Sequence, residues 1–432
     1  MNDKLNQETK FSDGEALHGA MLEIGVSSQK AVRELSTVST KSKNKALFEA
    51  AKAIRDKKAI IQAANNEDMS TAKKKKISGA MLDRLLLDDS RIEGMAKSLE
   101  DIAALPDPVG DIMAEWERPN GLKINRVRVP LGVIGIIYES RPNVTADAGG
   151  LCLKSGNAAI LRGGSESFYS SATILDCLQQ GLKKADLPIT AIQQVPTRDR
   201  AGVGELLSMS EYIDIIVPRG GKSLIERVQK ESRVPVIAHL DGNCHIYLEQ
   251  TADPTMAKNV VFNAKMRRPG ICGATESLIV DRSVASQLLP AIIDSLAMAG
   301  CEIRGDDDTQ NIDGRVRPAT EEDWGTEYLD TIISVKQVDG LDEAINHINK
   351  YGSHHTDSIV TNDGTAAAKF LETVDSAIVL HNASTQFADG GEFGMGAEIG
   401  ISTGRLHARG PVGVEQLTTF KYIVRGDGQV RS

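Results

Sequence analysis

The sequence predicts an α/β protein with two blocks of alternating strands and helices. One observation behind this prediction is that apolar residues recur at helical spacing between about residues 15 and 101. Another is a set of short, wholly apolar runs separated by helical stretches, which is typical of buried parallel strands. Because the same alternation resumes near residue 277, we expect two doubly wound α/β domains with a possible cleft between them.

The first block follows the helical region, which the proline-containing segment 105–108 ends. Residues 122–129 mix charged and apolar side chains, as expected of an exposed ribbon. Strands are expected in the apolar runs 133–137, 158–161, 192–195, 213–217, 236–238 and 246–248.

In the second block, strands are expected at 277–280, 331–338, 358–360 and 377–380, and helices at 284–299 and 342–348. The glycine-rich segment 389–413 also contains Phe, Met and Ile, so we expect an ordered loop beside a site. Residues 414–425 are expected to form a strand that pairs with another element or subunit.

Composition excludes several classes of protein. The 432 residues are 41% hydrophobic and 25% charged, as in ordinary globular proteins. The net charge of −9 weighs against nucleic-acid binding, and no apolar run is long enough to cross a membrane. Residues 1–15 lack a signal-peptide pattern, and the five cysteines are odd in number with no CxxC pair. We therefore expect a cytoplasmic protein without disulfides, and, because HExxH is absent, without a metal site.

Cys272 is the candidate nucleophile. Glycines near it on both sides leave the sulfur accessible, and Arg267 and Arg268 are expected to lower its pKa and attract an anionic substrate. Cys152 and Cys177 have apolar neighbours and are expected to be buried thiols. From the residues alone, a structural thiol remains an equal alternative for Cys272.

Two Arg-Gly-Gly turns follow predicted strands, and no GxGxxG or complete P-loop is present. The turns consist of Arg162, Gly163 and Gly164, and of Arg219, Gly220 and Gly221. Backbone amides in such turns can bind phosphate, although chain geometry alone also requires glycine turns. After the strand at 133–137, Asn143 is a candidate oxyanion donor or, alternatively, the cap of the next helix.

Three longer stretches carry a resemblance to a known family: PLGVIGIIYESRPN at 130–143, KSGNAAILRGG at 154–164 and RPGIC at 268–272. They resemble the aldehyde dehydrogenase superfamily and, more closely, its branch that reduces gamma-glutamyl phosphate. Similar stretches at 239–245, 322–328 and 404–413 extend the resemblance over about residues 18–425.

The resemblance implies an aldehyde dehydrogenase-like fold. A Rossmann-type NADP-binding domain would comprise residues 1–112 and 133–241, and a catalytic domain with the nucleophilic cysteine residues 242–408. Residues 113–132 and 409–432 would form oligomerisation strands of a homo-oligomer.

The implied reaction is the NADPH-dependent reduction of gamma-glutamyl phosphate to glutamate 5-semialdehyde and phosphate through a cysteine thioester. This is the second step of proline biosynthesis, and a transient contact with glutamate 5-kinase would deliver the labile substrate. The alternatives are another acyl reductase or aldehyde oxidiser of this fold, and a non-catalytic protein, against which the intact Cys272 and Asn143 argue.

The resemblance also implies residue roles. Cys272 is the nucleophile and Asn143 the oxyanion donor. Ser165 stands where NAD-dependent relatives carry an acidic residue, and Arg162 would pair with the 2′-phosphate. Cofactor contacts are expected from Arg162, Gly163, Gly164, Ser165, Arg219, Gly220, Gly221 and Glu327, with Glu322 as the alternative to Glu327. Substrate contacts are expected from Arg267, Arg268, Arg405 and His407, with surface salt bridges as the alternative. His239 stands where hydrolytic relatives carry a water-activating glutamate.

Overall fold

The computed structural model describes residues 14–77 and 79–431. The predicted lack of a signal pattern at 1–15 falls almost wholly outside these residues. The chain forms two compact units. The first comprises the residues up to Ala238, Gly394–Gly400 and the chain from Val412 onward; the second comprises His239–Phe393 and Ile401–Pro411. The boundary between units therefore lies three residues before the predicted one, and part of the glycine-rich segment returns to the first unit.

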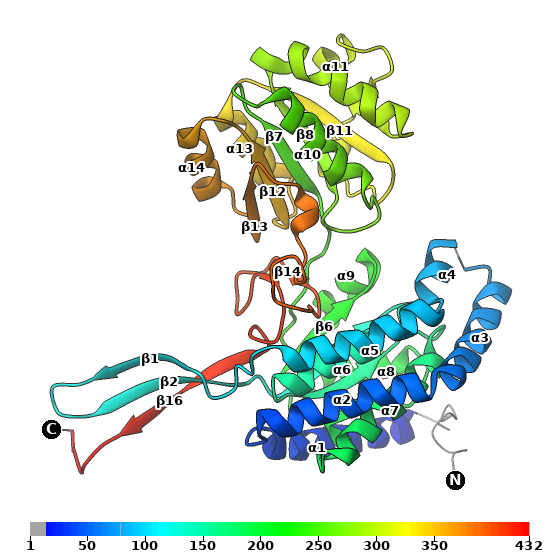
Figure 1. The fold of residues 1–432 in the computed structure, drawn as a ribbon, viewed down its shortest axis with the longest axis vertical. Helices are drawn as coiled ribbons and strands as arrows, with labels where there is room; N and C mark the ends of the chain where they lie inside the picture. Colours follow the sequence, from blue (N-terminus) through cyan, green and yellow to red (C-terminus); the bar gives the residue numbers. More distant parts are fainter. Residues whose placement is uncertain (1–13, 78, 432) are drawn as a thin grey trace. The chain divides into compact units, whose positions relative to one another are not determined.

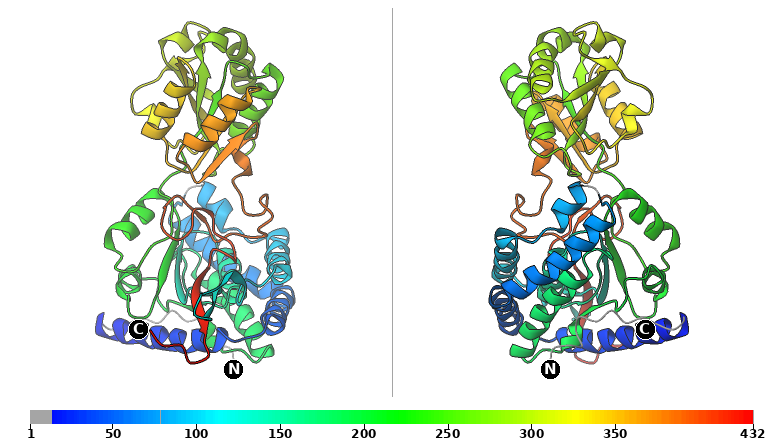
Figure 2. Two further views of the ribbon diagram at one scale, coloured as in Figure 1. Left: turned by 90° about the vertical axis from the view of Figure 1, so that its left-hand side faces the viewer. Right: turned by 90° about the vertical axis from the view of Figure 1, so that its right-hand side faces the viewer.

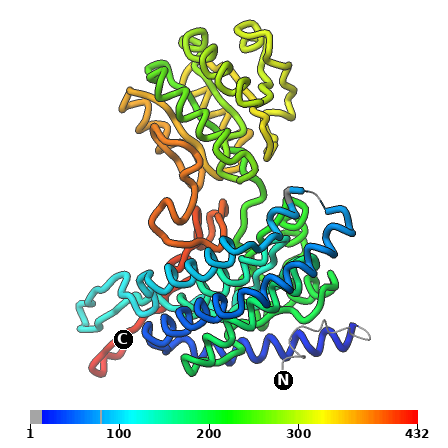
Figure 3. Tube along the Cα trace, turned by 45° about the vertical axis from the view of Figure 1, so that its right-hand side comes forward, coloured from blue at the N-terminus to red at the C-terminus, as the bar shows by residue number. Residues whose placement is uncertain are grey.

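The first unit begins with helices, as predicted (Figure 1, Figure 3). These are α1 (Gly14–Leu35), α2 (Thr40–Asp56), α3 (Lys58–Lys74), α4 (Gly79–Leu85) and α5 (Asp89–Ala104). The first turns of α2 and α5 are capped by side chains, which satisfy backbone N–H groups that lack a partner within the helix. Ser39 accepts a hydrogen bond from Ser42 N at 3.2 Å, and Asp88 accepts one from Arg91 N at 2.8 Å.

A four-stranded parallel sheet of order β5-β4-β3-β6 forms the centre of the first unit. Its strands are β3 (Val133–Tyr138), β4 (Ala158–Arg162), β5 (Ile192–Gln194) and β6 (Ile215–Arg219), and the Val, Ile and Leu side chains that predicted them are buried. The connecting elements are α6 (Val144–Lys154), α7 (Phe168–Lys184), η1 (Ile189–Ala191) and α8 (Ala201–Ser208), and α9 (Lys222–Glu231) follows β6.

The strand predicted at 236–238 is wrong. Only a single bridge joins Val236 to Ile216 beside β6. Pro235 has no N–H to extend the ladder, and the chain enters the second unit at His239. The run at 246–248 is a strand, but it belongs to the sheet of the second unit.

A separate antiparallel sheet contains β1 (Ile112–Glu117), β2 (Lys123–Pro130) and β16 (Thr418–Arg425), in the order β1-β2-β16. The predicted ribbon and the predicted C-terminal strand thus pair with each other within the chain. Trp116 packs edge-on against Tyr422, and Phe420, Tyr422 and Val424 are exposed. The oligomerisation role of this sheet stays a prediction.

The second unit is built on a seven-stranded parallel sheet of order β10-β9-β11-β8-β7-β12-β13. Its strands are β7 (Cys244–Leu248), β8 (Thr275–Asp281), β9 (Glu302–Gly305), β10 (Arg317–Pro318), β11 (Ile332–Val338), β12 (Thr356–Val360) and β13 (Ile378–His381). Its helices are α10 (Pro254–Met266), α11 (Arg282–Met298), α12 (Asp307–Gln310), η2 (Asp323–Gly325), α13 (Leu341–Tyr351), α14 (Gly364–Thr373) and η3 (Thr385–Phe387).

Helices cover both faces of this sheet (Figure 2). Ile246 and Leu248 of β7 pack in one core with α10 and α11, whereas Tyr247 packs in a second core with α13 and α14. Successive residues of a strand point to opposite faces, so the wholly apolar run that predicted β7 is what a doubly covered strand requires.

The glycine-rich segment is mostly loop, with one two-stranded antiparallel sheet of β14 (Ile401–Ser402) and β15 (Gly410–Pro411). Among the described residues, none of the helices combines the length and apolar composition needed to cross a membrane.

The crossing of α2 and α7 yields a prediction about stability. A Cβ at Gly181 of α7 would lie 2.3 Å from the carbonyl oxygen of Ala46 in α2. Gly181→Ala would force the helices apart, so we expect it to lower the free energy of unfolding by about 1–3 kcal/mol. Urea unfolding followed by circular dichroism measures the change.

The matched control is Gly94→Ala in α5, where the added Cβ meets nothing within 4 Å. Here alanine is expected to raise the free energy of unfolding by up to about 1 kcal/mol, through helix propensity alone. Equal effects of the two substitutions would contradict the crossing argument.

Candidate active site

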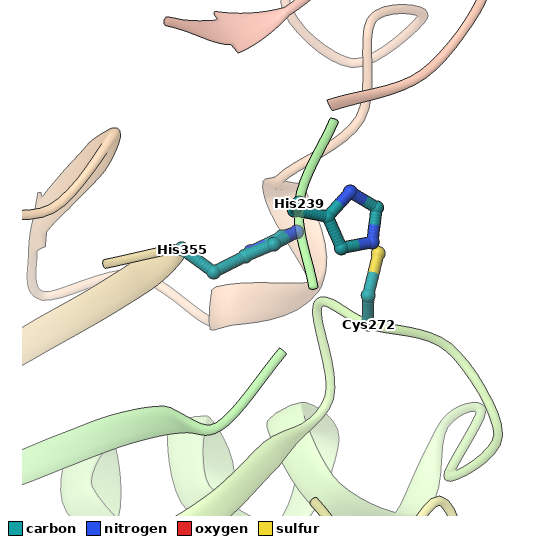
Figure 4. A group of neighbouring side chains, drawn as sticks. All are labelled: His239, Cys272 and His355. Carbon is teal, nitrogen blue, oxygen red and sulfur yellow. The ribbon is translucent and has the colours of Figure 1, made fainter. Parts of the chain in front are cut away.

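Cys272 lies at the amino ends of three adjacent strands of the second unit. Strands β8, β7 and β12 are neighbours in the sheet and all run parallel. Cys272 closely precedes β8, His239 precedes β7 and His355 directly precedes β12. Because amino ends of parallel strands meet at the same edge, residues far apart in sequence come together here (Figure 4).

The three side chains form a compact cluster. One ligand-type atom from each of His239, Cys272 and His355 lies within 4.8 Å of those of the other two. The two imidazole rings meet edge to face, with centroids 5.1 Å apart.

The two imidazoles are oriented by oxygen atoms. His239 Nδ1 lies 2.8 Å from the carbonyl oxygen of Ile401, and because a carbonyl only accepts, Nδ1 carries the proton. Figure 4 shows the other ring nitrogen turned toward the Cys272 sulfur. His355 is fully buried, and its Nδ1 lies 2.8 Å from Thr356 Oγ1. Its Nε2 is buried without a hydrogen-bond partner among the described residues.

The backbone of Cys272 is packed against the loop before β7. A Cβ at Gly242 would lie 2.2 Å from the Cys272 carbonyl oxygen, so only glycine fits there. The Cys244 thiol donates to the same carbonyl at 3.1 Å. Gly242 N in turn donates to Glu327 Oε1 at 2.9 Å, which ties a third loop to the site.

Cys272 is partly exposed, whereas the other four cysteines are buried, and all five lie in the described part of the chain. Burial raises the pKa of Cys177 to about 12 and that of Cys301 to about 11, and it also raises the pKa values of Cys152 and Cys244. These four thiols are therefore protonated and inert, and the predicted burial of Cys152 and Cys177 is confirmed.

Arg405, a predicted substrate contact, instead makes an ion pair with Asp375, which Arg409 also binds at 2.7 Å. Hydrogen bonds from Arg409 and then Arg405 hold the pKa of Asp375 below its usual value. Arg405 thus makes a surface salt bridge, which was the alternative to a substrate contact in the sequence analysis. His407 is exposed in a left-handed conformation (φ 68°).

Arg267 and Arg268 follow α10 and are exposed. Arg267 Nη1 lies 3.4 Å from Gln386 Oε1. Their contact with substrate stays a prediction, as it does for Arg405 and His407.

The first unit contains a cavity of about 420 Å³ beyond the carboxyl ends of its parallel strands. The sheet order reverses direction around β3, and ligands of open α/β sheets bind at such a reversal. The cavity is lined by Met81, Ile137, Tyr138, Glu139, Arg162, Gly164, Ser165, Glu166, Arg198, Arg200, Val203, Ser223, Leu224 and Arg227.

Arg162 lines this cavity, but its guanidinium is hydrogen-bonded to the protein backbone. It is 6% exposed, and its guanidinium donates to the carbonyl oxygens of Arg198 at 3.0 Å and Asp199 at 3.2 Å. The cavity also contains three arginines that were not predicted to lie there: Arg198, Arg200 and Arg227. Arg198 and Arg200 come soon after the predicted strand 192–195, and their place at the end of a strand could have indicated a role in binding.

The cavity is also lined by an acidic residue that was not predicted to lie there, Glu166, next to Ser165. Its carboxylate accepts hydrogen bonds from Ser140 N at 2.7 Å and Ser140 Oγ at 2.6 Å. A Cβ at Gly164 would lie 2.1 Å from Glu166 Oε1, so the first Arg-Gly-Gly turn is closed around this carboxylate.

The second Arg-Gly-Gly turn already holds an anion of the protein. Gly221 N, at the start of α9, donates to Glu139 Oε2 at 2.8 Å. A Cβ at Gly220 would lie 2.4 Å from the same oxygen. The turn therefore accommodates a negative group against its backbone, and its contact with a phosphate stays a prediction. Arg219 ends β6 beside it.

Asn143 stands at the N-terminal boundary of α6 but makes no capping hydrogen bond. Its Nδ2 donates to Asp147 Oδ2 at 3.0 Å, and burial raises the pKa of Asp147. Capping by its side chain is therefore not observed, and the oxyanion role stays a prediction. Of the two glutamates considered for the nicotinamide ribose, Glu327 contacts Gly242 beside Cys272, and Glu322 is exposed.

Comparison with known proteins places the chain in a family. The model of the aldehyde dehydrogenase family matches residues 23–312. The gamma-glutamyl phosphate reductase of Rhodospirillum rubrum is 62% identical over 413 residues, 96% of this chain and 97% of that protein. The protein of the same name from Methylocella silvestris is 61% identical over 430 residues, 99% of this chain and all of that protein.

A solved structure agrees with these relatives. The crystal structure of gamma-glutamyl phosphate reductase from Thermotoga maritima has a TM-score of 0.94 and 45% sequence identity, and it covers 95% of this chain and all of its own. The chain belongs to the aldehyde dehydrogenase family, and the predicted resemblance to its gamma-glutamyl phosphate reductase branch is confirmed.

Proposed function

We propose that the protein reduces gamma-glutamyl phosphate to glutamate 5-semialdehyde and phosphate with NADPH, through a thioester on Cys272. The observation that carries the proposal is the accessible Cys272 sulfur at the amino edge of the sheet, while the other four thiols are buried. The names of relatives about 60% identical over nearly the whole chain supply the substrate.

The chemistry begins with the Cys272 thiolate attacking the γ-acyl carbon of the substrate. A C–S bond forms, and the C–O bond to phosphate breaks, with phosphate as a good leaving group. The backbone amide of Cys272 is proposed to donate to the developing oxyanion; Asn143 is the predicted second donor. NADPH, when bound, supplies the hydride that turns the thioester into a thiohemiacetal. Its C–S bond then breaks, releasing aldehyde and regenerating the thiolate.

His239 explains why the thioester would survive until reduction. In hydrolytic relatives a glutamate at this position activates water. Here the position carries an imidazole whose Nδ1–H is held by the Ile401 carbonyl. The site therefore lacks the carboxylate with which hydrolytic relatives activate water, and the alternative, that the His239 imidazole acts as the base, is what the substitutions below test.

The charge of the cavity in the first unit supports binding of the phosphate-bearing part of NADPH. Four arginines line it against two glutamates, so its net charge is positive by two. Because Arg162 is bound to loop carbonyls, we assign the 2′-phosphate to Arg198 and Arg200 in the loop that Arg162 holds. Arg198 is itself positioned over the Tyr169 ring, 5.1 Å from its centroid.

The alternative is another acyl reductase or aldehyde oxidiser of this fold, and phosphate dependence separates the two. The homo-oligomer, the kinase contact and the cytoplasmic location stay predictions.

The reverse reaction tests the proposal. The full chain with glutamate 5-semialdehyde and NADP should form NADPH continuously only when inorganic phosphate is added. Without phosphate the thioester has no acceptor, so at most one NADPH per site is expected. Absorbance of NADPH measures both. Sustained turnover without phosphate would contradict the acyl-phosphate chemistry.

Cys272→Ser should lower this turnover by at least about 10⁴-fold and leave NADPH binding intact. Cys301→Ser, in a buried thiol of the same unit, is the matched control and should retain turnover. Retained activity in Cys272→Ser would overturn the assignment.

His239→Glu should restore hydrolysis. We expect the phosphate-independent rate of NADPH formation to rise by roughly tenfold or more, because the new carboxylate can activate water. His239→Gln, which is polar but not a base, is the control and should stay phosphate-dependent. If the two variants behave alike, His239 does not occupy the water-activating position.

The double variant Arg198→Gln/Arg200→Gln tests cofactor selection. Its Kd for NADPH should rise at least about tenfold, because each hydrogen bond to a charged group contributes roughly 1.5–3 kcal/mol. Its Kd for NADH, which lacks the 2′-phosphate, should change little. Fluorescence titration measures both constants, and an equal loss for the two cofactors would place the arginines elsewhere.

A further inference from the structure

We propose that His239, Cys272 and His355 form a Zn²⁺ site whose occupation reversibly inhibits the enzyme. The three donors are one thiol and two imidazoles, the set that Zn²⁺ prefers among protein ligands. Three protein ligands with a fourth position open is a common arrangement for zinc in a site that solvent reaches. The sequence predicted no metal site because it contains neither HExxH nor a CxxC pair.

The separations suit zinc after a small adjustment. The ligand-type atoms of the cluster lie within 4.8 Å of one another. Tetrahedral zinc with Zn–N and Zn–S bonds of usual length would hold them roughly 3.4–3.6 Å apart. Binding of Zn²⁺ would therefore draw the three donor atoms together, through adjustment of their side chains and of the loop that carries Cys272.

The imidazoles are oriented as metal ligands usually are. A ligating histidine binds the metal with one nitrogen and an oxygen atom of the protein with the other. His239 uses Nδ1 for the Ile401 carbonyl, and His355 has its Nδ1 2.8 Å from Thr356 Oγ1. The other nitrogen of His239 faces the Cys272 sulfur in Figure 4, and His355 Nε2 is the nitrogen without a hydrogen-bond partner among the described residues.

His355 provides the strongest single indication. Its side chain is fully buried, yet Nε2 has no hydrogen-bond partner among the described residues. Figure 4 shows its ring extending toward His239 and the Cys272 sulfur. A buried nitrogen is normally paired, and a metal ion between these three side chains would satisfy it.

Binding requires only these three side chains, whereas inhibition rests on the function proposed above. Zinc would take the Cys272 sulfur as thiolate, with release of its proton to solvent, and leave no free nucleophile for the acyl carbon. Removal of the ion by a chelator would return the thiolate, so the inhibition would be reversible.

The experiment measures binding apart from activity. The full chain is freed of metal with EDTA and titrated with Co²⁺, whose visible and thiolate charge-transfer bands report a tetrahedral site with sulfur, and then with Zn²⁺. We expect one Co²⁺ per chain, displaced by Zn²⁺. The charge-transfer band should disappear in Cys272→Ser and persist in Cys301→Ser. His355→Gln should weaken Zn²⁺ binding at least about tenfold.

A second readout covers the case in which His355→Gln does not fold. Zn²⁺ should protect Cys272 of the unsubstituted protein from alkylation by iodoacetamide, as mapped on peptides, and EDTA should restore the reaction. Absence of a sulfur-to-cobalt band, absence of protection, or unchanged affinity in a folded His355→Gln would each overturn the site.

The outcomes for site and function are separable. Zinc binding without phosphate-dependent turnover would support the metal site and contradict the proposed function. Phosphate-dependent turnover that Zn²⁺ does not inhibit would contradict the inhibitory site and leave the function intact.

Discussion

The parallel pairing of β7 with β8 on one side and β12 on the other is the constraint on which the candidate active site depends. It brings the loops that enter three strands to one edge of the sheet. The loops before β7 and β8 touch through their backbones, because Gly242 leaves no room for a Cβ beside Cys272. The position of the thiol is therefore set by the strand register and by one glycine, and side-chain packing around the sulfur is secondary.

The two units use opposite edges of their sheets. In the first, the cavity lies beyond the carboxyl ends of the strands, where helices begin and backbone amides are free to bind anions. Glu139 at Gly221 N shows that an anion fits there. In the second, Cys272 lies at the amino edge of the sheet. A thiol and two imidazoles supply the chemistry at that edge.

Much of the fold could be predicted from the sequence, because buried parallel strands contain short apolar runs, as β3, β4 and β6 do. The strand predicted at 236–238 is reduced to one bridge because Pro235 has no N–H to extend the ladder and the chain enters the second unit at His239. Cys272 could be found from its neighbours. His355 could not, because its place beside Cys272 follows from strand order, which local patterns do not encode. The hydrogen bonds of Arg162 to loop carbonyls could not be predicted either, because they depend on the loop that folds over it.

The same features that would make Cys272 a nucleophile would also make it a zinc ligand. A thiol must be accessible to attack an acyl phosphate, and an accessible thiolate beside imidazoles is a good ligand for soft cations. Replacement of a glutamate by His239 would protect the thioester from water, but it also adds a nitrogen donor at the sulfur. His355 adds the second donor, and its buried Nε2 has no hydrogen-bond partner in the described part of the chain that a metal ion would have to replace. Sensitivity to zinc would therefore be the chemical consequence of a site that reduces its thioester and does not hydrolyse it.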